Sequence, residues 1–277
     1  MNKGKLRAVC QKISKETGLS FNAIQTHYFL ESILEKIADS EENENFIFKG
    51  GFLLANVIGI RQRSTVDIDF LIRRFSLTEE NIEQRFKKIL QTGKDNGITY
   101  EIQKIEEIHK EDEYGGFRIK ILCRLENIRQ VIPLDIATGD PITPNEISYE
   151  YKSIFSDKVF EICAYNIETM LAEKIQTVFQ RGVFNSRSKD FYDIYVLYHL
   201  KKEEIDFGSL KKACQNTFKH RSTDFNIDSI LDVLQNLKDE KDLKTRWKNY
   251  QKRFTYAEEV SFGDVTNTAI ELIENLR

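Results

Sequence analysis

The chain has 277 residues, with 41 Lys and Arg side chains against 44 Asp and Glu, for a formal net charge of −3. This near balance excludes an overall basic nucleic-acid binder of the histone or ribosomal kind, although it allows a local basic surface. The four cysteines are scattered without a C-x-x-C pair, which excludes a disulfide scaffold or structural zinc site and indicates a reducing compartment. No apolar run approaches the ~18 residues of a membrane span, and no secretory signal is evident, so we expect a soluble cytoplasmic protein with no membrane partner.

Hydrophobic spacing divides the chain into a mixed half and a helical half. In chain order, the first half is predicted to contain a helix at 19–39, a strand at 46–48, a Gly50-Gly51 turn, a short helix at 52–60, a strand at 67–72, a helix at 76–93, and strands at 98–105, 116–125, 130–136 and 159–164. The second half is predicted to contain helices at 166–182 and 188–201, with weaker helical periods from 208 to 277. We therefore predict an α/β (α+β) domain over residues 1–165 and a helical C-terminal domain over residues 166–277.

Gly50 and Gly51 lie between a predicted strand and a predicted helix. Glycines there let the backbone approach a ligand closely, and the free N–H groups at a helix start favour an anion such as a phosphate. The alternative is that the pair forms an ordinary turn.

Asp67 and Asp69 are separated by one residue within an apolar strand, so their carboxylates point to the same face. Two like charges this close favour a bound cation, and Mg²⁺ (or Mn²⁺) prefers such oxygen ligands. The alternative is a solvated face of an edge strand. Asp135 is another acid within an apolar strand, where it could join the first two or simply cap a loop.

Three stretches together resemble the DNA polymerase β-like nucleotidyltransferase superfamily: KGGFLL, RQRSTVDIDF and PLDIATGDPI. Further segments resemble its AbiEii/AbiGii toxin family: FLESILEKIA, the stretch around Lys174, and the stretch from Arg187 to Tyr195. The resemblance covers roughly residues 19 to 200 in the right order. One departure is Phe52, which stands where the superfamily's glycine turn usually carries a hydroxyl residue.

The resemblance implies transfer of a nucleotide from a nucleoside triphosphate (ATP, GTP or another NTP). It implies that Asp67, Asp69 and Asp135 hold one or two Mg²⁺ ions, with Asp135 also helping to activate the acceptor hydroxyl. The expected nucleotide-binding residues are Gly50, Gly51, Arg63, Ser64 and Lys189. Arg63 could equally be a surface residue of a loop.

The same resemblance places Lys174 and Asp190 among the catalytic residues. On spacing alone, Lys174 reads as a lysine at the edge of the core, and Asp190 as an acid at a helix start. The resemblance suggests instead that Lys174 pairs with the triphosphate and that Asp190, or Asp193 one turn later, pairs with Lys174. We expect the helical half to form one side of the active-site cleft.

Basic residues gather in the second half. Residues 174–222 hold ten basic and five acidic side chains, and residues 244–254 hold five basic side chains and no acid. Basic groups with interleaved aromatics are typical of RNA binding, which makes Arg187, Arg246, Trp247 and Lys248 candidate acceptor contacts. The alternative is that Trp247, Tyr250 and Phe254 form the buried face of a helix.

The leading hypothesis is a toxin-like nucleotidyltransferase of a toxin–antitoxin or phage-defence system. Its acceptor would be RNA, with the tRNA 3′ end as one candidate, and its gene would be paired with that of an antitoxin. One alternative is a nucleotidyltransferase that modifies a small molecule or a protein. The other is a non-catalytic nucleotide-binding interaction module.

Overall fold

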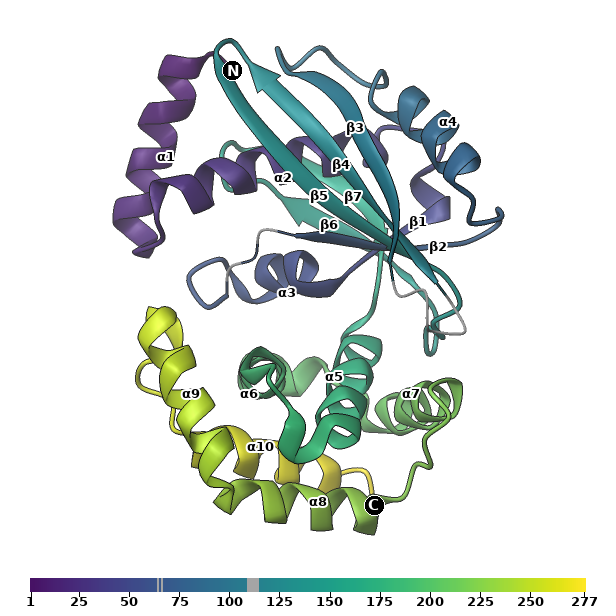
Figure 1. The fold of residues 1–277 in the computed structure, drawn as a ribbon, viewed down its shortest axis with the longest axis vertical. Helices are drawn as coiled ribbons and strands as arrows, with labels where there is room; N and C mark the ends of the chain where they lie inside the picture. Colours follow the sequence, from purple (N-terminus) through teal and green to yellow (C-terminus); the bar gives the residue numbers. More distant parts are fainter. Residues whose placement is uncertain (64, 66, 109–114) are drawn as a thin grey trace. The chain divides into compact units, whose positions relative to one another are not determined.

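The computed structural model describes residues 1–63, 65, 67–108 and 115–277 (Figure 1). The predicted residue Ser64 lies outside the described residues. Contacts divide the chain into two compact units: unit 1 comprises residues 1–139 and 147–164, and unit 2 comprises residues 140–146 and 165–277. No helix within the described ranges has the length and apolar character needed to cross a membrane.

Unit 1 is built on a seven-stranded mixed sheet with the strand order β3-β4-β5-β2-β1-β7-β6. The pairs β2–β5 and β1–β7 are parallel, and the remaining neighbours are antiparallel. Its strands are β1 (Phe46–Lys49), β2 (Ile68–Ile72), β3 (Thr99–Ile108), β4 (Gly116–Leu125), β5 (Ile128–Ala137), β6 (Ile147–Lys152) and β7 (Val159–Ala164). Its helices are α1 (Lys3–Thr17), α2 (Phe21–Ala38), α3 (Gly50–Ile58) and α4 (Glu79–Ile89). The predicted mixed α/β class is therefore confirmed.

The core of unit 1 follows from strand alternation. Every second residue of the central strands is apolar and buried, as in Phe70 of β2, Leu134 of β5 and Ile119 of β4. Helix α2 packs against β5 and β7, while α4 packs against β3. The intervening positions of the same strands include charged residues such as Asp69, Asp135 and Arg118, so one side of β3, β4, β5 and β2 carries a set of charges.

Two elements of unit 1 have no counterpart among the predicted elements. Helix α1 begins after Asn2, whose side chain accepts a hydrogen bond from the Lys5 N–H, and ends at Gly18 with a left-handed φ of 76°. Strand β6 pairs with β7 along its whole length. Helix α3 also begins at Gly50 itself, so the predicted Gly50-Gly51 turn forms the first residues of a helix.

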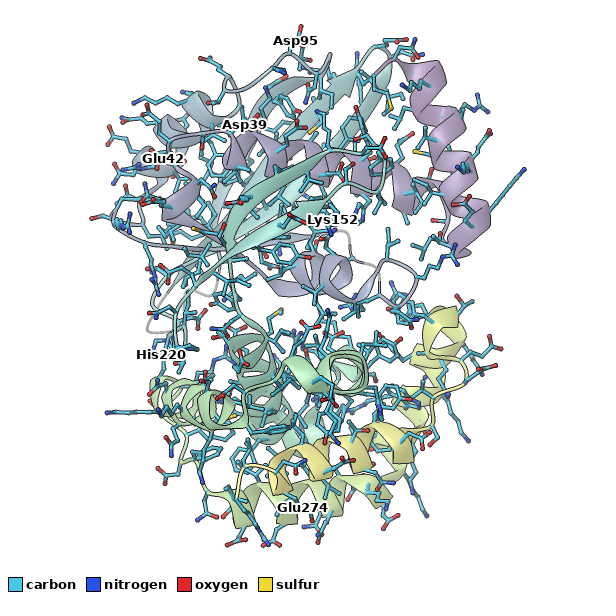
Figure 2. All side chains as sticks on the ribbon, turned by 180° about the vertical axis from the view of Figure 1, so that it is seen from behind. Asp39, Glu42, Asp95, Lys152, His220 and Glu274 are labelled. Carbon is cyan, nitrogen blue, oxygen red and sulfur yellow. The ribbon has the colours of Figure 1, made fainter. Side chains whose placement is uncertain are left out.

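Unit 2 is helical, as the periodicity predicts. Its helices are α5 (Ile167–Arg181), α6 (Ser188–Lys201), α7 (Phe207–His220), α8 (Ile227–Asp239), α9 (Lys241–Arg253) and α10 (Phe262–Glu274). The connecting residues 140–146 belong to this unit, because the Asn166 side chain donates to the carbonyls of Thr143 (2.9 Å) and Asn145 (2.8 Å). Asp39 in unit 1 and Glu274 in unit 2 are examples of exposed acids (Figure 2).

Candidate active site

The turn from β1 into α3 is shaped around the carboxylate of Asp69. Gly50 has a φ of 75°, and a Cβ atom on it would lie 2.0 Å from Asp69 Oδ2. A residue other than glycine would therefore be strained and would collide with the carboxylate. Asp69 thus lies directly beside the first residue of a helix, where free backbone N–H groups and the helix dipole favour negative charge.

Arg63 lies on the other side of the same turn. A Cβ atom on Gly51 would lie 3.5 Å from the Arg63 Nη2 atom and 3.3 Å from the Thr65 hydroxyl. Arg63 is only 5% exposed, which rules out the alternative of a solvated loop residue. The structure therefore gathers four predicted residues at one point: Gly50, Gly51, Arg63 and Asp69.

A row of charged residues runs across the sheet from this turn. Asp69 of β2 is in register with Lys49 of β1 on one side and with Asp135 of β5 on the other. Asp135 is in register with Arg118 of β4, which in turn is in register with Glu106 of β3. Because in-register residues of neighbouring strands share a face, all five belong to one side of the sheet.

Arg118 holds Asp135 with two hydrogen bonds. Its Nε donates to Asp135 Oδ1 and its Nη2 donates to Oδ2, each at 2.7 Å. This bond to Asp135 is the main cause that raises the pKa of the Arg118 guanidinium, and the charge of Asp67 adds to it. The two carboxylates Asp67 and Asp135 therefore act on one guanidinium.

Glu106 ends the row with a separate ion-pair network. Its carboxylate pairs with Lys104 at 2.5 Å and with Lys120 at 2.7 Å. Hydrogen bonds from these two ammonium groups lower the pKa of Glu106 to about 2. This acid is therefore held by its own cations, apart from the three predicted acids.

The residues present fit a divalent cation in chemistry but only partly in arrangement. The cradle of Gly50 around Asp69, with Asp67 two residues earlier, offers the carboxylate oxygens that Mg²⁺ and Mn²⁺ prefer. However, the described part of the chain contains no group of three or more His, Cys, Asp or Glu arranged to hold a metal ion. Both oxygens of Asp135 accept hydrogen bonds from Arg118, and the shared role of the three acids as metal ligands stays a prediction.

In unit 2, the predicted residues Lys174 and Asp190 form an ion pair at 2.9 Å between α5 and α6. Lys174 also pairs with Asp193 at 2.8 Å, so it holds both candidate partners at once. The lysine side chain is 15% exposed and both aspartate side chains are 0% exposed. Burial alone would lower the pKa of Lys174, but the two carboxylates outweigh burial and raise it.

Arg187 adds a second cation to this cluster. Its Nε lies 2.8 Å from Asp190 Oδ2, so two cations and two carboxylates balance one another. Lys189 lies in the first turn of α6, directly before Asp190. Arg187 is therefore paired with the buried Asp190 while its own side chain stays 39% exposed, and its role as an acceptor contact stays a prediction.

The other predicted acceptor contacts differ in burial and in hydrogen bonding. Trp247 is 2% exposed and its Nε1 donates to the Val260 carbonyl at 2.9 Å, so its predicted role as a stacking surface is wrong and it is a core residue. Arg246 donates to the carbonyls of Val183 (3.3 Å) and Asn185 (3.0 Å), which ties its guanidinium to the α5–α6 connection. Lys248 is exposed.

The sequence analysis missed two residues that could take part in binding or catalysis. Arg118 carries no motif, and only its register with Asp135 identifies it. Phe184, in the short helix Gly182–Phe184 between α5 and α6, is 85% exposed. The signal that could have found Phe184 is the segment 181–189, which contains three basic residues, no acid and one aromatic residue.

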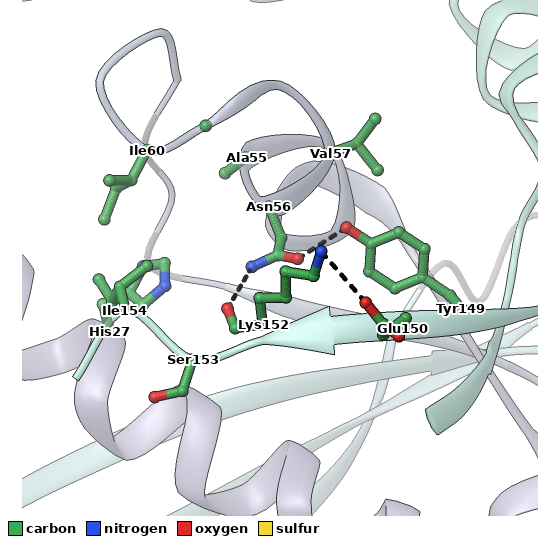
Figure 3. Close-up of a pocket in the computed structure, with 11 residues that line it drawn as sticks. His27, Ala55, Asn56, Val57, Ile60, Tyr149, Glu150, Lys152, Ser153 and Ile154 are labelled. Carbon is green, nitrogen blue, oxygen red and sulfur yellow. Dashed lines mark hydrogen bonds and ion pairs between the residues drawn. The ribbon is translucent and has the colours of Figure 1, made fainter. Parts of the chain in front are cut away.

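A pocket of about 570 Å³ lies in unit 1 beside the end of α3 and strand β6 (Figure 3). Its wall includes Asn56, which accepts from the Tyr149 hydroxyl at 2.7 Å and donates to the Lys152 carbonyl at 3.2 Å (Figure 3). The described residues that line this pocket include none of the predicted site residues. This pocket is thus separate from the carboxylate row.

Comparisons with known proteins agree with the fold. A crystal structure of a candidate nucleotidyltransferase from H. pylori is similar over 93% of this chain and 96% of that chain, with 17% identity and a TM-score of 0.56. The crystal structure of JHP933 from Helicobacter pylori is similar over 93% of each chain, with 17% identity and a TM-score of 0.54. No curated protein matches the chain.

The sequence also matches a family model, that of the nucleotidyl transferase AbiEii toxin of type IV toxin–antitoxin systems, over residues 32–268. The match covers most of both units and includes Gly50, Asp69, Asp135 and Lys174. The predicted resemblance is therefore confirmed: this chain belongs to the AbiEii family of nucleotidyltransferase toxins.

Proposed function

We propose that this nucleotidyltransferase moves a nucleotide from an NTP to a hydroxyl of an RNA acceptor in a reaction that depends on a divalent cation. The observation that carries the proposal is the position of Asp69 against Gly50 at the start of α3. It brings a carboxylate ligand for a cation and the backbone N–H groups of a helix start to one point. A nucleoside triphosphate requires both kinds of contact.

In this account Asp67, Asp69 and Asp135 hold the cation, and the first turn of α3 with Arg63 binds phosphate oxygens. The bound cation would neutralise the triphosphate and orient it for in-line attack. The acceptor oxygen forms a bond to the α-phosphorus while the bond from that phosphorus to the bridging oxygen breaks, releasing pyrophosphate. We assign acceptance of the hydroxyl proton to Asp135, which lies across the β2–β5 pair from Asp69.

For Lys174 we propose a contact with a phosphate oxygen. Its ammonium group has three donors, and the ion pairs to Asp190 and Asp193 account for two of them. Because these two carboxylates favour the charged form, the lysine stays cationic at all physiological pH values. Lys189 is proposed to bind the nucleotide as well, on the strength of its place in the family motif.

For the acceptor we propose that Phe184 replaces Trp247 as the stacking surface. The ring is held outward on a well-tied connection, because Arg246 binds the carbonyls on both sides of it and the Asn185 side chain accepts from the Arg187 N–H at 2.8 Å. An exposed aromatic ring in a basic segment suits an unpaired base of a nucleic acid. Lys248 remains a candidate phosphate contact.

The family's place in type IV systems implies an antitoxin partner, without specifying a contact with it. The test of the proposal is incubation with each α-³²P-labelled NTP, Mg²⁺ and total RNA, followed by gel separation. We expect label in an RNA species, including tRNA, with one or two NTPs preferred. Label in protein or in a small molecule instead would overturn the RNA acceptor, and no transfer at all would overturn the reaction.

A further inference from the structure

The ion pair between Arg118 and Asp135 joins two neighbouring strands on the charged side of the sheet. Both oxygens of the carboxylate accept from the guanidinium, at 2.7 Å each. Neither partner is deeply buried, since the side chains are 39% and 21% exposed. A partly solvated pair of this kind contributes little to stability, so little free energy holds the arginine in place.

The place of this pair matters because Asp135 is in register with Asp69. A divalent cation shared by these carboxylates would need an oxygen of Asp135. Arg118 takes both of these oxygens, so the arginine and a cation compete for the same atoms. Among the described residues, the hydrogen bonds of the Arg118 side chain go to Asp135 alone, and the charge of Asp67 also attracts it.

Glu106 does not anchor Arg118 elsewhere. Although the two residues are in register, the Glu106 carboxylate pairs with Lys104 and Lys120. Within the described ranges, Arg118 thus hydrogen-bonds to an acid of the proposed site, while the charges of Asp67 and Glu106 attract it without a hydrogen bond. Its guanidinium also has the forked donor geometry that binds a phosphate as well as it binds a carboxylate.

We propose that Arg118 is an exchangeable counter-ion of Asp135, which it releases when it binds a phosphate of the incoming triphosphate. This inference rests on the proposed function. Before nucleotide binds, the arginine balances Asp135 and keeps cation affinity low. Triphosphate binding draws the guanidinium away, frees Asp135, and so couples the binding of nucleotide and cation, an effect that must be reciprocal.

The first measurement is Mn²⁺ binding without nucleotide, followed by the electron paramagnetic resonance signal of free Mn²⁺. We expect Arg118→Gln to bind Mn²⁺ about tenfold more tightly than the wild type, in the usual range of such couplings. Arg124→Gln is the matched control. Arg124 is also on β4, pairs with Glu101 at 2.6 Å, and its side chain is 38% exposed. It should leave Mn²⁺ affinity unchanged.

The second measurement is binding of inorganic tripolyphosphate by calorimetry in metal-free buffer. Here we expect Arg118→Gln to bind the anion about tenfold more weakly, because one forked donor is lost. Opposite changes in the two affinities are the signature of an exchangeable counter-ion. A purely structural arginine would lower both, and a thermal unfolding curve for each variant checks that the fold is intact.

Equal or weaker Mn²⁺ binding by Arg118→Gln would overturn the counter-ion role while leaving the cation site in place. Asp67→Asn in the Arg118→Gln background separates that result from failure of the proposed function. We expect this second substitution to remove the tight Mn²⁺ binding. If the wild type and Arg118→Gln bind no Mn²⁺, with or without ATP or GTP, both the proposed cation site and the role of Arg118 are overturned.

Discussion

The two units hold their charges in different ways. In unit 1, Asp135 and Arg118 face solvent in part, with side-chain exposures of 21% and 39%. In unit 2, Asp190 and Asp193 are 0% exposed and are neutralised by Lys174 between them. Exchangeable, partly hydrated charges suit the binding of ligands that come and go, whereas a buried and balanced cluster fixes helices in place. From this comparison we propose that unit 1 carries the chemistry and that most of the cluster in unit 2 has a positioning role.

The largest effect should come from Asp69→Asn, which tests the unit 1 side of this comparison. The substitution keeps the shape beside Gly50 but removes a charged cation ligand, so we expect nucleotide transfer to fall by on the order of 10²–10³-fold or more. The rate of label transfer from NTP measures it. Glu106→Gln is the matched control on the same side of the sheet and should change the rate by less than about twofold, because Glu106 pairs with Lys104 and Lys120.

Lys174→Met tests the buried cluster of unit 2. Removing the ammonium group takes one paired cation away from two fully buried carboxylates, so we expect the free energy of unfolding to fall by about 3–5 kcal/mol. Urea unfolding followed by circular dichroism measures the change. Lys244→Met is the control, because Lys244 pairs with Asp239 on the surface and should change stability by less than about 0.5 kcal/mol. A loss as small as that of the control would show that the cluster does not hold α5 and α6 together.

Glu31 of α2 sharpens the comparison, because it is a buried carboxylate whose described partners include no cation. It accepts from the Ser153 hydroxyl, from the Tyr151 hydroxyl at 3.3 Å and from the Ile154 N–H at 3.4 Å. Burial raises the pKa of Glu31 from 4.5 to about 7, although these hydrogen bonds oppose the rise. The folded chain therefore keeps a proton that the unfolded chain releases between these two pH values.

It follows that the contribution of Glu31 to stability is complete below about pH 4.5 and is lost as the pH rises to about 7, a change of about 3 kcal/mol. We expect Glu31→Gln to remove this slope, so that the stability of the variant relative to wild type increases across that window. Urea unfolding at a series of pH values measures it. Glu83→Gln, on α4 and paired with Lys87 on the surface, is the control. Parallel curves for Glu31→Gln and wild type would refute the account of this residue.

The smallest effect concerns acceptor binding by unit 2. Truncating Phe184 to Ala removes one stacking surface, worth about 1–3 kcal/mol per base, so RNA affinity should fall by roughly 5- to 150-fold. Because Phe184 is 85% exposed, stability should not change. A filter-binding titration with labelled RNA measures the affinity, and Leu200→Ala, at a site that is 49% exposed, is the control. Equal losses of RNA affinity for the two variants would show that the aromatic ring has no special role in binding.

The sequence predicted one pairing of this site, that of Lys174 with Asp190 or Asp193, but not the pairing of Arg118 with Asp135. The alternation around Asp69 follows from the two-residue period of a strand, which is a local property, whereas Lys174 and Asp190 lie on different helices and their pairing was predicted from the family resemblance. Arg118 could not be found in this way, because a cation on an alternating strand looks like any solvated residue until the register of β4 and β5 is known. Trp247 was misjudged for a related reason: a stripe of aromatics beside lysines fits a buried helix face and an RNA surface equally well.

For the fold, too, elements with a clear local pattern were predicted and an element that depends on pairing with a distant segment was not. The buried strands β1 and β2 are evident from their apolar runs, and the cap at Thr78 marks the start of α4. Strand β6 escaped prediction because Tyr151 is buried within a segment that is otherwise mostly polar and exposed, so tertiary pairing with β7 decides its structure.

The most direct test of the central claim compares NTP labelled at the α-phosphate with NTP labelled at the γ-phosphate in the RNA transfer assay. If the carboxylates of unit 1 carry nucleotidyl transfer, label enters RNA only from the α-phosphate, and Asp69→Asn abolishes it while remaining folded. Label entering RNA from the γ-phosphate, or transfer by Asp69→Asn at the wild-type rate, would contradict the account.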